Sequence, residues 1–301
     1  MNLIPMPTLR FASVRAALIL GLTTLTLGGC VSLHSIHEQR QLYIPHVSNA
    51  PLDIVTQNGS IEILQSDRRD VALIVDLHGH DHDRVSHAII RADRLADDTL
   101  SVSVNWPGGF IKNDEGASFI LDIPNAQGIE AHTSNGNIFI TGLSGHANLT
   151  SSNGSVTVDR HDGSVFAQTG NGNITAEHIS SDIELFTTNG SLVITDVFGT
   201  VWGETSNGNI YASTTDGNEG PINLRTSNGR LDLDLGDGFM GILKAYNSNG
   251  KITVKDLDAR LIQSTRNSTE LQIGDSSEES RLETSNGSVR IRGTHTEPMG
   301  D

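Results

Sequence analysis

The dipeptide Asn-Gly recurs at nearly constant spacing through the second half of the chain, and this repeat restricts the possible folds more than any other feature. The asparagines are Asn135, Asn153, Asn171, Asn189, Asn207, Asn228, Asn249 and Asn286, and Asn267 continues the series with serine in place of glycine. Successive intervals are 18, 18, 18, 18, 21, 21, 18 and 19 residues. Fixed periods near twenty residues indicate a solenoid built from one repeated unit.

Apolar residues alternate with polar ones on both sides of each asparagine. Counted from the asparagine, the apolar positions are −6 and −4 before it and +3 and +5 after it, as in Ile183, Leu185, Leu192 and Ile194 around Asn189. This period of two predicts two short strands per repeat, each with one buried face. We expect Asn-Gly to form the corner between them, because both residues tolerate positive φ.

The same dipeptide is also the strongest short-range signal for a β-hairpin, so an antiparallel meander is the alternative architecture. A meander does not require one residue type to recur in register, whereas a solenoid stacks each position on its equivalent in the next coil. The sequence therefore predicts an all-β fold, a single-stranded parallel β-helix (right-handed solenoid) with coils of about 18 residues. We expect the asparagines to form a buried amide ladder in sequence order, with Asn189 in its middle and Asn286 near its end. Ser or Thr at most −2 positions predicts a parallel column of inward hydroxyl groups.

The rest of the chain divides into segments of different character. We expect a lipoprotein signal peptide at 1–29, a lipidated tether at 30–40, an irregular β entry and capping region at 41–124, the solenoid at 125–293 and a tail at 294–301. The capping region contains strand-like runs at 71–77, 99–104 and 119–123. Apolar spacing does not decide whether 83–95 is a short helix or a loop with a strand. A copy of the repeat at Asn58 stands apart from the array.

The first thirty residues have the pattern of an export signal. Arg10 and Arg15 precede an apolar stretch at 16–27, which is too short to span a bilayer as a permanent helix. The stretch ends in Leu-Gly-Gly before Cys30, a spacing that resembles the bacterial lipobox and implies acylation of Cys30. Cys30 is the single cysteine, so no disulfide can form within the chain. We expect a lipid-anchored protein of the cell envelope, with the outer membrane favoured because Val31 rather than aspartate follows the cysteine.

Composition limits the partners. The formal net charge is −16 at pH 7, which argues against nucleic acid and anionic headgroups as ligands. Aromatic residues make up 4% of the chain, so stacked aliphatic rows rather than a large aromatic core must provide the buried surface. We expect the membrane, through the N-terminal lipid, and a protein or glycan as partners, with no cofactor.

The repeats resemble those of a known bacterial family. The run Ser118–Pro124, the Thr-Ser-Asn-Gly copies that begin at Thr133, and the opening 41–45 with Asn58-Gly59 are similar to the DUF4097 proteins, described as "putative adhesins" with β-strand repeats. The resemblance covers roughly residues 40–293. It implies a solenoid in the cell envelope, and it supplies no catalytic residues.

One histidine-rich run lies outside that resemblance. His78, His80 and His82 would share one face of an extended strand and could present three imidazoles to zinc, copper or nickel. An exposed polar loop explains the same residues. The two 21-residue intervals carry their extra residues at 216–220 and 236–240, opposite the Asn-Gly corner, where solenoids often place variable or binding loops.

An enzymatic β-helix is the main alternative to a binding protein. Such enzymes need clustered carboxylates on one outer face beside a cleft, and only Asp232 and Asp234 are suggestive here. The sequence contains no Gly-x-Ser-x-Gly, Walker-type or Cys/His motif. We therefore expect a non-enzymatic, adhesin-like or scaffolding protein. An envelope-stress or assembly factor is the second expectation, and a polysaccharide lyase or hydrolase is the third.

Overall fold

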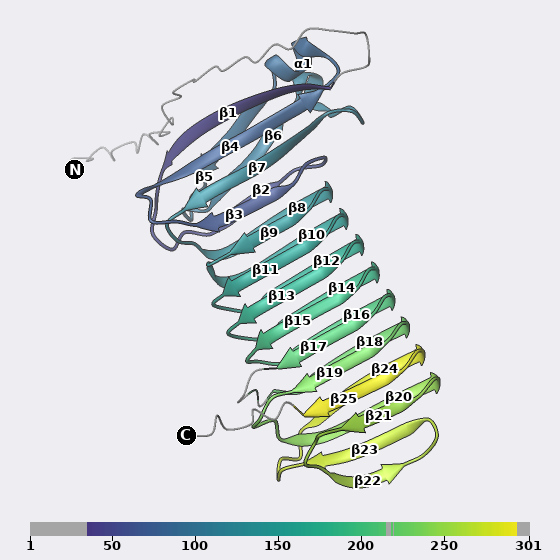
Figure 1. Cartoon of the computed structure of the whole chain (residues 1–301). Helices are drawn as coiled ribbons and strands as arrows, with labels where there is room; N and C mark the ends of the chain where they lie inside the picture. The colour runs from purple at the N-terminus through teal and green to yellow at the C-terminus, as the bar shows by residue number, and fades with distance from the viewer. Residues whose placement is uncertain (1–34, 215–217, 219, 294–301) are drawn as a thin grey trace, which may run out of the picture.

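The protein is built from two long β-sheets that run side by side along one axis (Figure 1). The computed structural model describes residues 35–214, 218 and 220–293. Sheet A has 12 strands and sheet B has 13, and each regular coil contributes one strand to each sheet. Cys30 and the expected signal peptide lie outside the described residues.

Six regular coils follow one another along the chain, and we call them the sequential stack. Their strands are β8 (Gln127–Asn135) and β9 (Ile138–Thr141), β10 (Ser144–Asn153) and β11 (Val156–His161), β12 (Val165–Asn171) and β13 (Ile174–Ile179), β14 (Ile183–Asn189) and β15 (Leu192–Val197), β16 (Val201–Asn207) and β17 (Ile210–Thr214), and β18 (Ile222–Asn228) and β19 (Leu231–Leu235). Neighbouring strands are parallel and pair asparagine with asparagine, as in Asn171 with Asn189. The parallel solenoid is confirmed, and the meander is excluded.

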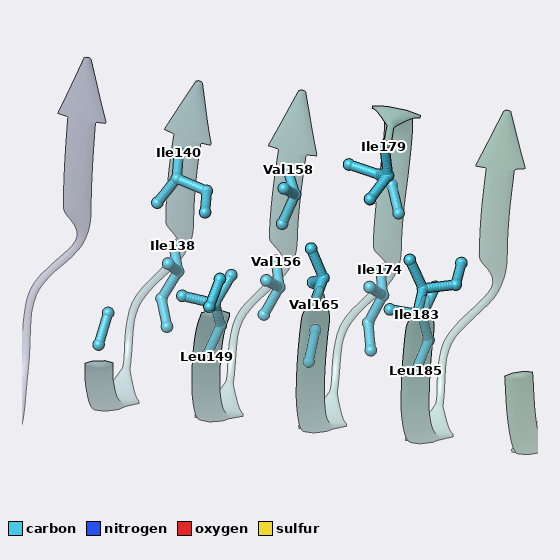
Figure 2. Packing of buried hydrophobic residues seen from close by; sticks show 14 of the residues in the cluster. Ile138, Ile140, Leu149, Val156, Val158, Val165, Ile174, Ile179, Ile183 and Leu185 are labelled. Atoms are coloured by element: carbon cyan, nitrogen blue, oxygen red, sulfur yellow. The ribbon is translucent and has the colours of Figure 1, made fainter. Parts of the chain in front are cut away.

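The core of the stack consists of the alternating apolar positions predicted from the repeat. Figure 2 shows these side chains from facing strands, among them Ile138, Val156 and Ile174 from sheet A and Leu149 and Leu185 from sheet B. All five are at most 1% exposed. The core is therefore made of rows of apolar side chains at equivalent positions of successive coils. A single large core does not form, because each coil is too thin to bury its apolar face alone.

Glycine follows asparagine because two backbones approach closely at this corner. A Cβ placed on Gly190 would lie 1.8 Å from the carbonyl oxygen of Gly172, and one on Gly208 would lie 1.9 Å from that of Gly190. No glycine of this column in the sequential stack has φ in the left-handed region. The expectation that Asn-Gly serves for its positive φ was wrong: the constraint is the space between coils.

A column of buried hydroxyl groups joins each coil to the one before it. Thr169 donates to the carbonyl oxygen of Gly154 at 2.8 Å, and Thr187 donates to that of Gly172 at 2.9 Å. The same bond recurs at Ser151, Thr205, Thr226 and Thr284. These hydroxyls point inward, and each one donates to a backbone carbonyl of the neighbouring coil, as expected for buried polar groups.

The asparagine side chains form a continuous ladder on the surface. Asn171 donates to Asn153 at 2.8 Å, Asn189 to Asn171 at 2.9 Å and Asn207 to Asn189 at 2.9 Å. The ladder begins one coil earlier than the array, because Asn135 donates to Asn58 at 2.7 Å. Its asparagines from Asn135 onward are exposed and Asn58 is half-buried, so the expectation of a buried ladder was wrong.

The order of coils departs from the order of the sequence at the C-terminal end. The chain passes from β19 to β20 (Gly241–Asn249) and β21 (Ile252–Lys255), then returns so that β24 (Glu279–Asn286) and β25 (Val289–Gly293) lie between the two coils. Figure 1 shows this inserted coil in yellow between two green ones. β24 pairs with β18 on one side and β20 on the other, and β25 pairs likewise with β19 and β21.

The insertion changes two expectations about the ladder. Asn286 donates to Asn228 and accepts from Asn249, both at 2.9 Å, so Asn286 is an interior member and Asn249 is the terminal one. Asn267 is not in the ladder: its amide donates to the backbone carbonyls of Asn247 and Ser248. Residues 236–240 connect across the inserted coil rather than forming a corner loop within a single coil.

Different elements close the two ends. At the C-terminal end, the antiparallel strands β22 (Arg260–Ser264) and β23 (Ser268–Ile273) cover the edge of β20 in sheet B. The N-terminal end contains β1 (Ile36–Pro45), β2 (Leu52–Val55), β3 (Ile61–Gln65), β4 (Asp70–Gly79), α1 (His82–Ser86), β5 (Ile89–Arg94), β6 (Leu100–Asn105), the 3-10 turn η1 (Pro107–Gly109) and β7 (Gly116–Ile123).

The N-terminal elements extend the stack before capping it. β2 and β3 pair in register with β8 and β9, so the copy at Asn58 is a coil of the same solenoid. β6 and β7 add a further irregular coil, and the antiparallel pairs β1–β4 and β5–β6 end the two sheets. The undecided segment 83–95 contains both elements, α1 and β5. Among the described residues, no helix is long and apolar enough to cross a bilayer.

Candidate functional site

The outward face of sheet B carries the features expected of a binding surface. At its N-terminal end is a groove of about 880 Å³ that opens to solvent. Its walls come from the ends of β2, β6 and β8 and from the segment 106–111 that follows β6. The lining residues are Val55, Thr56, Gln57, Ser103, Val104, Asn105, Trp106, Gly109, Phe110, Ile111, Ala117, His132 and Ser134. An apolar concavity with a few polar groups is the usual form of a ligand site.

A buried ion pair holds the wall of the groove in place. Arg84 of α1 donates to both carboxylate oxygens of Glu115, whose side chain is fully buried. The same guanidinium donates to the carbonyls of Pro107 and Phe110 and lies 4.9 Å from the Phe110 ring. Arg84 also holds the pKa of Glu115 below its usual value, so the pair stays charged.

Two exposed apolar side chains border the groove. Phe110 is 58% exposed and Val55 is 44% exposed, whereas Trp106 is buried. Gly108 and Gly109 precede Phe110 with φ of 80° and 76°, values that L residues rarely adopt, so this turn requires glycine. The turn thus presents Phe110 at the rim while its neighbour Trp106 anchors the segment to the core.

Further along the same face, aromatic and acidic side chains gather at the middle of the stack. Phe166 on β12, Phe186 on β14 and Trp202 on β16 all point outward, with Glu184 and Glu204 between them. The Phe166 and Phe186 rings lie 5.8 Å apart, and Trp202 is 45% exposed. We call these five residues the aromatic–acidic patch.

Sheet A presents a different chemistry near its C-terminal end, because arginines lie beside two of its outward carboxylates, Asp232 and Asp234. Arg292 of the inserted coil donates to both oxygens of Asp234, at 2.7 and 2.8 Å, and Tyr211 donates to the same carboxylate at 3.3 Å. The bond to Asp234 raises the pKa of Arg292. Asp232 lies within 4.0 Å of Arg290 and 3.8 Å of Arg230. Of the two aspartates that suggested an acid/base pair, Asp234 therefore holds the inserted coil. Asp232 makes no hydrogen bond to it, and its Oδ1 is buried without a hydrogen-bond partner among the described residues.

The three histidines considered as metal ligands take separate partners. The His78 ring stacks on His37 with centroids 5.7 Å apart, His80 bonds to Asp114 at 2.9 Å, and His82 begins α1 with its side chain 77% exposed. The strand ends at Gly79, so the three side chains do not share one face of a strand. In the described part of the chain, the residues close enough to share an ion are Asp159, Glu177 and His178. They lie on the exposed face of sheet A, and His178 already bonds to Asp159 at 2.9 Å.

Comparison with known proteins yields only distant likenesses. No family model and no curated protein matches the chain. Among solved structures, a "putative adhesin" from Bacteroides fragilis is 14% identical, with 87% of this chain and 98% of that chain covered and a TM-score of 0.41. Another from Parabacteroides distasonis is 12% identical, with 86% and 97% covered and a TM-score of 0.49. A "putative cell adhesion protein" from Clostridium sporogenes is 11% identical, with 87% and 100% covered and a TM-score of 0.26.

All three TM-scores lie below 0.5. Membership of the DUF4097 family stays a hypothesis that rests on the repeat motifs. The groove and the aromatic–acidic patch were both missed in the sequence. The patch could have been found, because Phe166, Phe186 and Trp202 stand at outward positions of the repeat. The groove could not, because it joins residues from β2, β6 and β8 that are far apart in the chain.

Proposed function

We propose that this protein is a lipid-anchored, non-enzymatic component of the bacterial envelope that binds a protein or glycan on the outward face of sheet B. The observation that carries the proposal is the groove between Val55, Phe110 and His132, which combines apolar side chains with polar ones such as Gln57 and Ser103. Acylation at Cys30 would tether the chain, with the outer membrane favoured. The solenoid would then present sheet B as an adhesin-like or scaffolding surface.

The asymmetry between the faces supports binding rather than catalysis. On sheet A, both oxygens of Asp234 accept from Arg292 of the inserted coil, so this carboxylate is not free to act as a general acid or base beside Asp232. On sheet B, the groove contains His132 as its titratable side chain and no carboxylate. Glycoside hydrolysis requires two carboxyl groups facing one substrate, and the groove does not supply them.

A pair of matched variants tests the groove. Val55→Arg would place a long charged side chain in the groove, and Val193→Arg makes the same change at an outward position of β15 in sheet A. We expect crosslinked envelopes to lose the captured partner with Val55→Arg and to keep it with Val193→Arg. Equal capture by both variants would contradict the assignment of the groove, and turnover in a glycan-degradation screen would contradict the non-enzymatic proposal.

The anchor has its own test. Growth with a clickable fatty acid should label the wild-type protein, whereas Cys30→Ser should abolish both the label and fractionation with membranes. A Cys30→Ser protein that stays labelled would show that the lipid is attached elsewhere or that the lipobox assignment is wrong.

A further inference from the structure

The aromatic–acidic patch has an alternating arrangement that strand register imposes. Phe166, Glu184 and Trp202 occupy equivalent positions in three successive coils, so they form one column across sheet B. Phe186 and Glu204 form the next column, two residues further along their strands. Coils repeat at about 4.8 Å, so each carboxylate lies within one strand spacing of an aromatic ring.

The rings are outward although the chain has few of them. Aromatic residues make up 4% of the sequence, and one of its two tryptophans stands in this patch at 45% exposure. The Phe166 and Phe186 rings pack against each other at 5.8 Å with an interplanar angle of 43°, which fixes one edge of the patch. Burial in the core does not explain these positions, because inward neighbours such as Leu185 already fill it.

The carboxylates of the patch have no partner among the described residues. Neither Glu184 nor Glu204 appears in any hydrogen bond or ion pair of that part of the chain, and Arg225, in register beside Glu204, forms no ion pair with it. This contrasts with Asp232 and Asp234 on sheet A, which have arginines beside them. Two unpaired carboxylates among aromatic rings create a site that attracts positive charge through both groups.

We propose that the aromatic–acidic patch binds an arginine-bearing segment of a partner polypeptide. A guanidinium is planar, so its edge donates two parallel hydrogen bonds to a carboxylate while its face stacks on an aromatic ring. Glu184 and Glu204 supply the carboxylates, and Trp202 and Phe186 supply the rings beside them. An ammonium group can lie over a ring and donate to a carboxylate, but it has no planar face to stack and cannot donate two parallel hydrogen bonds to one carboxylate. A neutral glycan would need the rings but gain little from the charges.

This inference deepens the proposed function, and it rests on sheet B being the binding face. It assigns a partner chemistry to a surface that begins two coils away from β8, the nearest strand of the groove, so the two can fail separately. If the patch does not bind arginine, capture of a partner through the groove and its loss in Val55→Arg are unaffected.

Trp202 offers a direct readout in the full-length chain purified in detergent. The other tryptophan, Trp106, is 7% exposed, so a ligand on the patch should change mainly the Trp202 emission. The probe is a short peptide of alternating arginine and glycine, compared with its lysine counterpart and with a neutral β-linked oligosaccharide. We expect the arginine peptide to bind several-fold more tightly than the lysine peptide.

Matched variants separate the patch from the general negative charge of the protein. Glu184→Gln with Glu204→Gln removes two charges inside the patch, and Glu130→Gln with Glu177→Gln removes two exposed or half-exposed ones outside it. We expect the first pair to weaken arginine-peptide binding about tenfold and the second less than about twofold. Phe186→Ala removes a ring of the patch but keeps the Trp202 reporter, and it should weaken binding as well. Unchanged melting temperatures would show that all variants fold.

Three outcomes would overturn the inference. Equal losses in the two double variants would show non-specific electrostatic attraction. Equal affinity for the arginine and lysine peptides would show that the patch does not recognise the planar guanidinium group. Saturable binding of the oligosaccharide, lost in Phe186→Ala while the arginine peptide has no effect on fluorescence, would assign the patch to a glycan.

Discussion

The sequential stack and the C-terminal end use the same repeat but assemble it differently. From β8 to β19, each coil stacks on the coil that precedes it in the sequence. At the C-terminal end, the inserted coil formed by β24 and β25 separates β18–β19 from β20–β21. Both regions continue the asparagine ladder without a break, as Asn286 shows. The hydroxyl column also extends into the inserted coil through Thr284, but it ends there, because Asn247 stands at the equivalent position of β20.

The comparison shows that the repeat encodes a coil but not the coil's place in the stack. The coils of the sequential stack and the inserted coil all offer the same glycine carbonyl, a hydroxyl and the same amide to their neighbours, so the repeated bonds do not distinguish one order from another. Residues outside the repeat provide the distinction. Arg292 pairs with Asp234 of β19 on one side of the inserted coil, and Lys244 of β20 contacts Glu279 of β24 on the other, at 2.5 Å. Between coils of the sequential stack, uncharged ladders make most of the contacts.

Crosslinking would give the largest, all-or-none effect. Asn223 on β18 lies in register with Arg281 on β24, and Arg281 lies in register with Lys244 on β20. In a Cys30→Ser background, we expect Asn223→Cys with Arg281→Cys to form a disulfide, because parallel neighbours meet the required Cα separation. Asn223→Cys with Lys244→Cys should not, since β24 lies between them. The reverse pattern on a non-reducing gel would show that the coils follow sequence order.

Replacing a corner glycine by alanine should reduce the free energy of unfolding by about the same amount in both regions. A Cβ on Gly287 would lie 1.8 Å from the carbonyl of Gly229, the same distance as that from Gly190 to Gly172. Backbone cannot yield as a flexible side chain can, so we expect each of Gly190→Ala and Gly287→Ala to cost about 3 kcal/mol. Denaturant melts measure this cost. A much smaller loss for Gly287→Ala would indicate that the inserted coil is only loosely held.

Removing the ion pair should affect the inserted coil alone. Arg292→Met leaves Asp234, whose side chain is 13% exposed, without its bidentate partner. The arginine itself is 40% exposed, so solvent screening limits the expected cost to about 1 kcal/mol. Hydrogen exchange should speed up at 279–293 and stay unchanged at 147–212. Uniform acceleration over both regions would contradict a local role for the pair.

One substitution should stabilise the C-terminal end by making it resemble the stack. Asn247 stands at the position of the hydroxyl column, is 5% exposed, and has no partner for either side-chain atom among the described residues. Threonine there could donate to the carbonyl of Gly287, as Thr284 does to that of Gly229. We expect Asn247→Thr to raise stability by about 1 kcal/mol. A lower melting temperature would mean that the amide has a role that the hydroxyl cannot fill.

The ladder itself should give the smallest effects, because its amides are exposed. Asn189 and Asn286 each donate to one neighbour and accept from another, whereas Asn249 ends the ladder. We expect alanine at Asn189 or Asn286 to cost roughly 0.5–1 kcal/mol, and at Asn249 to cost less. Thermal melts of the three variants would rank them, and a loss at Asn286 as small as that at Asn249 would argue against its interior place.

Much of the regular architecture could be predicted from the sequence because it is local and repeated. Alternation around Asn189 specifies two strands and an inward face, and recurrence every 18 residues specifies parallel stacking. The sequence correctly predicted that Asn-Gly forms the corner, but it gave the wrong reason. Residue propensities describe a single turn, whereas the requirement for glycine comes from the backbone of the adjacent coil. His78, His80 and His82 do not lie together because the Asp81 side chain accepts a hydrogen bond from the backbone N–H of Arg84. This N-cap starts a helix at the point where the predicted strand would have continued.

The sequence by itself therefore determined the unit: the strand pair, the inward hydroxyls, the corner glycine and the acidic, aromatic-poor surface. Only the tertiary structure decided the order of the coils, the residues that form the groove, and the arginines that lie beside Asp232 and Asp234. These depend on which of several equivalent coil faces meet, and on side chains brought together from distant strands. Equal repeats leave that choice nearly degenerate in energy, so a few non-repeated contacts such as Arg292 with Asp234 are enough to decide it.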